Sequence, residues 1–81
     1  MNEFRLLDSA FRHGIAEADI LGVIYNSFDS KDVEGTDNRL RYGFDSKGNV
    51  VEVAYDHVER VVFHAMRVRN AANRVSEKRK R

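Results

Sequence analysis

Residues 39–66 read RLRYGFDSKGNVVEVAYDHVERVVFHAM and contain the clearest pattern in this 81-residue chain. In residues 39–44, apolar and non-apolar side chains alternate, which predicts a β-strand with one apolar face. Residues 45–49 predict a turn, because their glycine readily adopts the positive φ that such turns often need. Residues 51–55 predict a second strand, and residues 61–66, apolar on both faces, predict a third and central one.

On both sides of these predicted strands, the sequence shows the periodicity of helices. Apolar residues at helical spacing predict a short first helix over residues 2–13, and a second apolar stripe predicts a helix that begins near Glu17. Residues 29–38 are polar and predict a loop, with a short edge strand as the alternative. An apolar stripe from Val68 to Val75 predicts a C-terminal helix with a basic neighbouring stripe. The expected fold is α+β: two short N-terminal helices, a three-stranded antiparallel sheet with or without a fourth edge strand, and a basic C-terminal helix, all in a single domain over residues 1–81.

The near-neutral net charge of +1 hides a segregation of charge along the chain. Residues 1–56 carry 6 basic and 11 acidic side chains, a balance of −5, whereas residues 57–81 carry 8 basic and 2 acidic, a balance of +6. A basic C-terminal third attached to an acidic front is typical of a protein with a polyanionic partner. Two alternatives stay open: an acidic protein partner, and a solvated, disordered basic tail over Lys78–Arg81.

Several classes of site are excluded by the residues present. The chain has no cysteine, so disulfides, thiolate metal sites and thiol nucleophiles are absent, and a reducing cytosol is permitted. No apolar run approaches the ~20 residues that a membrane span needs. The three histidines show no metal-ligand spacing, the glycines form no phosphate-binding loop, and no serine has a nucleophile-elbow context. We therefore expect no membrane, metal or cofactor.

Arginine and histidine side chains remain as the candidates for chemistry. Guanidinium groups bind phosphate bidentately and can stabilise the charge of a phosphorane, whereas an imidazole can move a proton near neutral pH. RNA carries its own nucleophile, the 2′-hydroxyl, so these residue types are sufficient in principle to cleave it. The candidates are His13, Arg39, Arg41, His64 and Arg69. Their structural alternatives are a histidine satisfied within the core, arginines on a solvent-facing strand surface and charges at helix ends.

Three short segments form an ordered series along the chain. They are FRHGI at 11–15 followed by Glu17 and Asp19–Ile20, YGFD at 42–45 followed by Gly48 and Glu52–Val53, and HAMRVR at 64–69. In order and spacing, these segments resemble BrnT-like toxins of the RelE superfamily, the ribonuclease components of bacterial type II toxin–antitoxin pairs. The resemblance spans about residues 9–70.

This resemblance implies a RelE-like fold, a cytoplasmic location and metal-independent cleavage of mRNA, free or on the ribosome. It also implies a cognate antitoxin that covers the active face. On the matched positions it implies proton transfer by His64, a phosphate or transition-state contact from Arg69, a phosphate contact from Arg41, and His13 as a further catalytic candidate. Five further basic residues are candidates for RNA binding: Arg39, Arg67, Arg74, Lys78 and Arg79. The alternative function is a non-catalytic module that binds nucleic acid or protein through the basic C-terminal helix.

Overall fold

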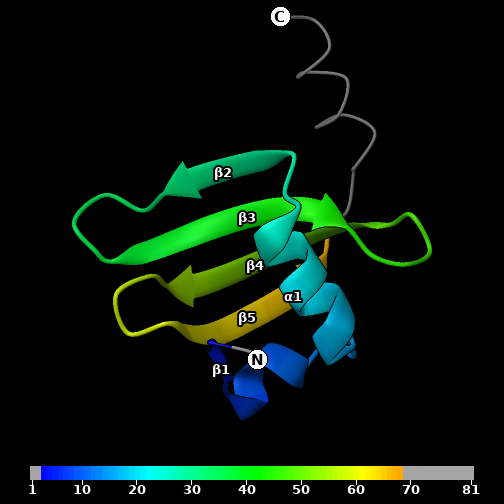
Figure 1. The fold of residues 1–81 in the computed structure, drawn as a ribbon, viewed down its shortest axis with the longest axis horizontal. Helices are drawn as coiled ribbons and strands as arrows, with labels where there is room; N and C mark the ends of the chain where they lie inside the picture. The colour runs from blue at the N-terminus through cyan, green and yellow to red at the C-terminus, as the bar shows by residue number, and fades with distance from the viewer. Residues whose placement is uncertain (1–2, 69–81) are drawn as a thin grey trace, which may run out of the picture.

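The computed structural model describes residues 3–68, which form a five-stranded mixed sheet with one α-helix and one short 3-10 helix (Figure 1). In chain order the elements are β1 (Arg5–Leu6), η1 (Asp8–Phe11), α1 (Glu17–Tyr25), β2 (Asp29–Asp32), β3 (Asn38–Phe44), β4 (Val50–Asp56) and β5 (Val61–Arg67). The strands lie in the order β1-β5-β4-β3-β2. β1 runs parallel to β5, and the other neighbouring pairs are antiparallel.

The expected RelE-like α+β fold, with two N-terminal helices and a three-stranded antiparallel sheet, is wrong because the described residues are mostly β. The apolar spacing in residues 4–11 fits a helix, yet Arg5–Leu6 pairs with β5. Two N–H groups of this segment donate to the carbonyls of Arg60 and Val62, each at 2.9 Å. Because an isolated helix of about 12 residues is marginal in water, pairing with the free edge of β5 prevails.

The other expected elements have different outcomes. The three predicted strands are confirmed as β3, β4 and β5, and β5 is an inner strand that lies between β1 and β4. The second predicted helix is confirmed as α1, which begins at Glu17. The alternative of an edge strand is confirmed by β2. The C-terminal helix expected from Val68 to Val75 lies outside the described residues, except for Val68 itself.

The turn between β3 and β4 is built around one carboxylate. Oδ1 of Asp45 accepts the backbone N–H groups of Lys47 (2.9 Å) and Asn49 (2.8 Å). Gly48 has a φ of +86°, a conformation that costs glycine little because it has no Cβ. The turn fixes the register of the hairpin, in which Arg41 pairs with Val53.

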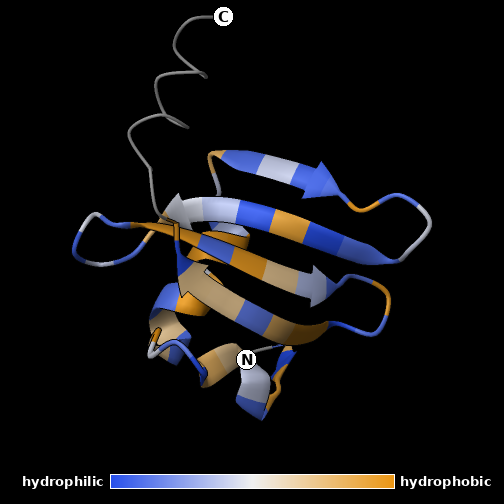
Figure 2. Cartoon of the chain, turned by 180° about the vertical axis from the view of Figure 1, so that it is seen from behind, coloured by the Kyte–Doolittle hydropathy of each residue, from blue (hydrophilic) through white to orange (hydrophobic). Residues whose placement is uncertain are grey.

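The two faces of the sheet differ in what covers them. α1 packs on one face, here called the helix face, where Gly43 pairs with Val51. A Cβ at Gly43 would lie 3.2 Å from Cα of Val23, so the glycine lets the helix approach the sheet closely. Figure 2 shows the opposite face, here called the open face, with α1 behind the sheet. The core between helix and sheet includes Ile20, Val23, Ile24, Val51, Val53, Val62 and Ala65.

The predicted alternation in β3 is confirmed, and Tyr42 is buried while Arg39 and Arg41 keep part of their surface exposed. The apolar face of the strand, however, is the one turned away from α1. Tyr42 pairs with Glu52 on the open face, whereas Arg39 and Arg41 share the helix face with Val53. Both arginines are half-buried beyond the end of α1, and Nε of Arg41 is itself buried. Within residues 3–68, no helix has the length and hydrophobicity that crossing a membrane demands.

Candidate functional site

A hydrogen-bonded group of three side chains lies on the open face. Tyr42 on β3 donates its hydroxyl to Oε2 of Glu52 on β4 (2.7 Å). The other carboxylate oxygen, Oε1, lies 3.1 Å from Nε2 of His64 on β5. The side chains of His64 and Glu52 are 30% and 25% exposed, so solvent still reaches them. These three residues and His13 are called the histidine cluster below.

A β-bulge in β5 turns His64 toward the open face. Ala54 pairs with His64, whereas Tyr55 pairs with Val62, so Phe63 is the extra residue. In a regular strand, Val62 and His64 would point to the same face, because side chains alternate with a period of two. The bulge keeps Val62 in the core while His64 joins Ala54 on the other face.

The same bulge holds the segment that carries His13. Ser9 in η1 donates its hydroxyl to the carbonyl of Phe63 at 2.7 Å, which fixes η1 beside β5. The chain then turns at Gly14, whose φ is +78°. His13 comes to lie with its ring centroid 5.9 Å from that of His64, with the ring planes at 78°. Two histidines that are 51 positions apart are therefore neighbours.

The histidine cluster contains the groups needed to move protons. An ionised carboxylate can only accept hydrogen bonds, so a neutral His64 facing Glu52 carries its proton on Nε2 and keeps the lone pair on Nδ1. Tyr42 occupies the second oxygen of Glu52 and so limits its rotation. His13 is exposed and can approach a bound substrate. The arrangement is suited to general acid–base chemistry without a metal ion.

The structure divides the other predicted site residues between regions. Arg39 and Arg41 lie on the helix face, so the sheet separates them from His64. Arg67 lies at the end of β5, 60% exposed, with Nε 3.8 Å from Oδ2 of Asp45. The predicted residues Arg69, Arg74, Lys78 and Arg79 lie outside the described range.

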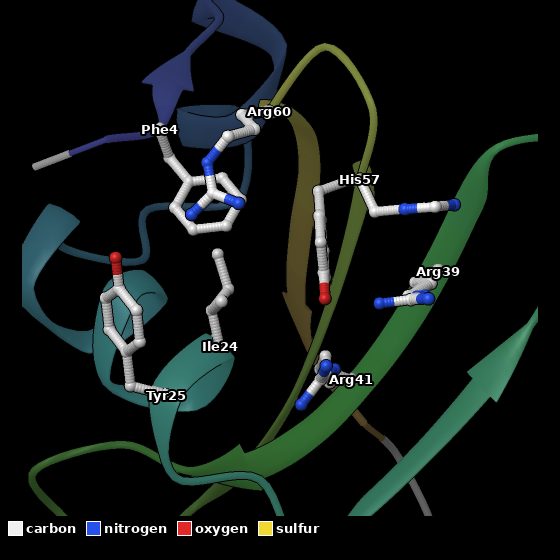
Figure 3. Close-up of a pocket in the computed structure, with 8 residues that line it drawn as sticks. Phe4, Ile24, Tyr25, Arg39, Arg41, His57 and Arg60 are labelled. Carbon is white, nitrogen blue, oxygen red and sulfur yellow. The ribbon is translucent and has the colours of Figure 1, made fainter.

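A second site, on the helix face, gathers the arginines (Figure 3). It is a pocket of about 440 Å³ between the last turn of α1 and the strands. This pocket is called the arginine pocket below. Its lining residues are Phe4, Ile24, Tyr25, Arg39, Arg41, Tyr55, His57 and Arg60. Figure 3 shows the Arg60 guanidinium over the Phe4 ring, where its central carbon lies 4.2 Å from the ring centroid.

The carboxylates that pair with these arginines are outside the pocket lining. Nε of Arg39 lies 3.0 Å from Oδ1 of Asp32, and Nη2 of Arg60 lies 2.9 Å from Oε1 of Glu3. Both acidic side chains are more than 70% exposed, and such surface pairs contribute only ~0–1 kcal/mol. Arg41 has no ion pair within the described part of the chain; it donates to the hydroxyl of Ser27 at 3.2 Å.

Asp45 is the carboxyl with a resolved pKa shift in the described residues. Burial alone would raise the pKa of Asp45. Hydrogen bonds from the backbone and side chain of Asn49 and from the N–H of Lys47, together with the charge of Arg67, outweigh burial and lower this pKa overall. Asp45 therefore stays ionised and holds the β3–β4 turn.

The sequence interpretation missed several residues of both sites. Glu52 had a visible signal, since it is a lone charge within the apolar run of β4. Arg60 had none, because it lies in a turn whose geometry the sequence does not display. Its φ of +57° marks it only once the backbone is known.

Comparison of the chain with family models, with curated proteins and with solved structures gave no match. Within residues 3–68, no three His, Asp or Glu side chains are grouped as metal ligands. The histidine cluster and the arginine pocket are the candidate functional sites of the described residues.

Proposed function

We propose that the chain is the toxin component of a bacterial toxin–antitoxin pair and cleaves mRNA without a metal ion. The observation that carries this proposal is the proximity of His13 and His64, whose ring centroids are 5.9 Å apart, with Glu52 beside His64. Both histidines belong to the segments that resemble BrnT-like toxins. Two proton transfers over hydrogen bonds of ~3 Å each are compatible with this separation.

The proposed reaction balances without any co-reactant. Neutral His64 takes the proton of a ribose 2′-hydroxyl through Nδ1, and the 2′-oxygen attacks the adjacent phosphorus. The bond from phosphorus to the 5′-oxygen breaks, and that oxygen takes a proton from protonated His13. The products are a 2′,3′-cyclic phosphate and a 5′-hydroxyl. Glu52 orients His64 and stabilises the imidazolium that forms.

The proposal also includes a phosphate contact, a protein partner and a location in the cell. Arg69 follows the last described residue and is proposed to contact the phosphate, because a guanidinium matches the charge that develops there. A cognate antitoxin is proposed to cover the open face, and the pair is proposed to act in the cytoplasm. His13 is exposed and solvent reaches His64 and Glu52, which supports this choice of face.

The first test is cleavage of a labelled RNA by the full chain, made in a cell-free system, with a metal chelator present. We expect products that end in a cyclic phosphate and a 5′-hydroxyl. His64→Gln and His13→Gln are each expected to slow cleavage by ~10²–10⁴-fold, the usual contribution of an acid–base group. Glu34→Gln, an exposed change outside the cluster, is the matched control. If both histidine variants cleave like the wild type, the proposed mechanism is wrong.

A second test uses growth. Induced expression of the wild type is expected to arrest growth and shorten transcripts, and His64→Ala combined with Arg69→Ala is expected to relieve both effects. RNA binding that weakens steeply with salt but gives no cleavage would instead identify the non-catalytic binding module. Harmless expression with no cleavage of free or ribosome-bound RNA contradicts the toxin.

A further inference from the structure

We propose that the arginine pocket binds the phosphate and base of a ribonucleoside 5′-monophosphate, either free or at the 5′ end of an RNA chain. The pocket lies on the helix face, and the sheet separates it from the histidine cluster. Neither the binding nor its test depends on RNA cleavage.

The lining of the pocket is positively charged, which favours an anionic ligand. Three arginines and one histidine line the pocket, and none of its eight described lining residues is acidic. A phosphate monoester carries up to two negative charges and several acceptor oxygens, so more than one guanidinium can bind it at once. A carboxylate has only two oxygens and one charge, and it matches this set of donors less well.

Among the three arginines of the pocket, Arg41 is the one that the described residues 3–68 compensate least. Its Nη1 donates to Ser27, and its Nε is buried without an acceptor among the described residues. Its central carbon lies 5.9 Å from the ring centroid of Tyr55, so the ring limits the positions of the guanidinium. Because a buried cation needs a counter-charge, a bound anion would supply what Ser27 and Tyr55 do not.

Arg60 occupies a position that is costly for its residue type. Its φ of +57° is left-handed, a conformation that costs an L-residue about 1–2 kcal/mol and that favours glycine or asparagine. The turn nevertheless carries arginine, whose guanidinium stacks on Phe4 at the pocket. Nε of Arg60 is also buried without an acceptor in residues 3–68. Outliers of this kind are concentrated at ligand sites, which agrees with a binding role.

The aromatic side chains provide a surface for a base. Tyr25 is 58% exposed at the end of α1, and its ring contacts Phe4 edge to face at a centroid distance of 6.0 Å. Stacking of a base on an aromatic ring contributes ~1–3 kcal/mol. The volume of about 440 Å³ lies within the ~300–1,000 Å³ typical of small-molecule pockets. Size, charge and aromatic surface together match a mononucleotide better than phosphate alone.

The test is calorimetric titration of the full chain with each of the four ribonucleoside 5′-monophosphates, with the matching nucleosides and with inorganic phosphate. We expect at least one monophosphate to bind more tightly than both its nucleoside and inorganic phosphate. Higher salt should weaken binding, since charged contacts dominate. If all four bind with a Kd above about 10 mM, the proposal is overturned.

Two variants separate loss of binding from loss of fold. Arg60→Gly removes the guanidinium at a position whose φ suits glycine, so the fold should be retained. Arg41→Lys keeps the charge and removes the planar fork. We expect each to weaken binding by about 10- to 100-fold, the loss of one charge-assisted contact. Lys47→Gln in the β3–β4 turn removes one exposed charge outside the pocket and is the matched control, with binding unchanged. Unchanged binding in both arginine variants overturns the proposal.

A further arm distinguishes the two sources of the nucleotide. A short RNA with a 5′-phosphate is compared with the same RNA bearing a 5′-hydroxyl, in the background of His64→Gln so that cleavage does not interfere. Tighter binding of the phosphorylated RNA supports recognition of RNA ends, and binding of free monophosphates alone supports a free nucleotide. Because His64 lies outside the pocket, nucleotide binding by this variant also keeps the two proposals separate.

Discussion

The two faces of the sheet carry two different kinds of site. On the open face, Tyr42, Glu52 and His64 bind one another, so donors and acceptors are paired within the histidine cluster. On the helix face, the arginine pocket collects cations whose acceptors in residues 3–68 are few or exposed. A self-paired network holds a histidine in a defined position, which suits proton transfer. A cationic pocket with little counter-charge suits the binding of an anion.

Adjacent residues of one strand supply both sites. Arg41 points to the helix face and Tyr42 to the open face, because side chains alternate along β3. A substitution at either position therefore reaches one site directly and the other only through the backbone. This makes the two sites separable by experiment.

Apart from the two proposed catalytic histidines, the largest effect is expected when the histidine cluster is broken at Glu52. Glu52→Gln removes the negative charge beside His64 and leaves the ring without its carboxylate acceptor. We expect kcat for RNA cleavage to fall by about 10²-fold, the lower end of what an acid–base group contributes, with KM unchanged. Tyr42→Phe removes one hydrogen bond to the same carboxylate and should have a smaller effect. Steady-state kinetics on a short labelled RNA measures both.

The same variants show whether the faces are independent. Nucleotide binding by the arginine pocket should be unchanged in Glu52→Gln, as it should be in the control Glu34→Gln. A parallel loss of nucleotide binding and cleavage would show that the two sites are coupled through the sheet.

The sequence predicted those parts of the fold that periodicity determines. The alternation in residues 39–44 and the helical stripe after Glu17 correspond to β3 and α1. The strand Arg5–Leu6 was missed because its pairing with β5 is non-local, while its own spacing fits a helix. The side of β3 that faces α1 was also not predictable, since alternation identifies two faces without showing which one a helix covers.

The site was predictable only in part for similar reasons. His13 and His64 were named from their segments, and the structure brings them together. The bulge at Phe63, which sends His64 to the open face, has no sequence signature in this strand. Arg41 was expected as a phosphate contact, and alternation along β3 puts it on the face opposite His64. The position of Arg60 at the arginine pocket depends on its left-handed backbone conformation, which the sequence does not reveal.

An intermediate effect is expected from a substitution that tests how tightly α1 packs. Gly43→Val adds a side chain whose Cβ alone would lie 3.2 Å from Cα of Val23. We expect the free energy of unfolding to fall by about 1–3 kcal/mol, the usual cost of overpacking. Phe44→Thr, the next residue and 53% exposed, should cost less than about 1 kcal/mol. Urea unfolding followed by circular dichroism measures both, and equal losses would contradict the difference between the packed and the open face.

The smallest effect is expected at Asp45, where a single carboxyl supports the hairpin that both faces share. Because its pKa is lowered in the folded chain, the unfolded chain binds the proton more readily as pH falls. The contribution of Asp45 to stability is therefore complete above the ordinary carboxyl value of ~4 and is lost as pH falls through the lower, folded value. Asp45→Asn keeps an acceptor for the N–H groups of Lys47 and Asn49 but cannot titrate. Unfolding free energies measured between neutral and acidic pH should thus depend less on pH in the variant than in the wild type.

The turn that Asp45 supports precedes β4, which carries Glu52 on one face and Tyr55 on the other. Any loss of function at low pH through Asp45 should therefore reduce cleavage and nucleotide binding together. An identical pH dependence of stability in wild type and variant would remove Asp45 as the shared support of the two faces.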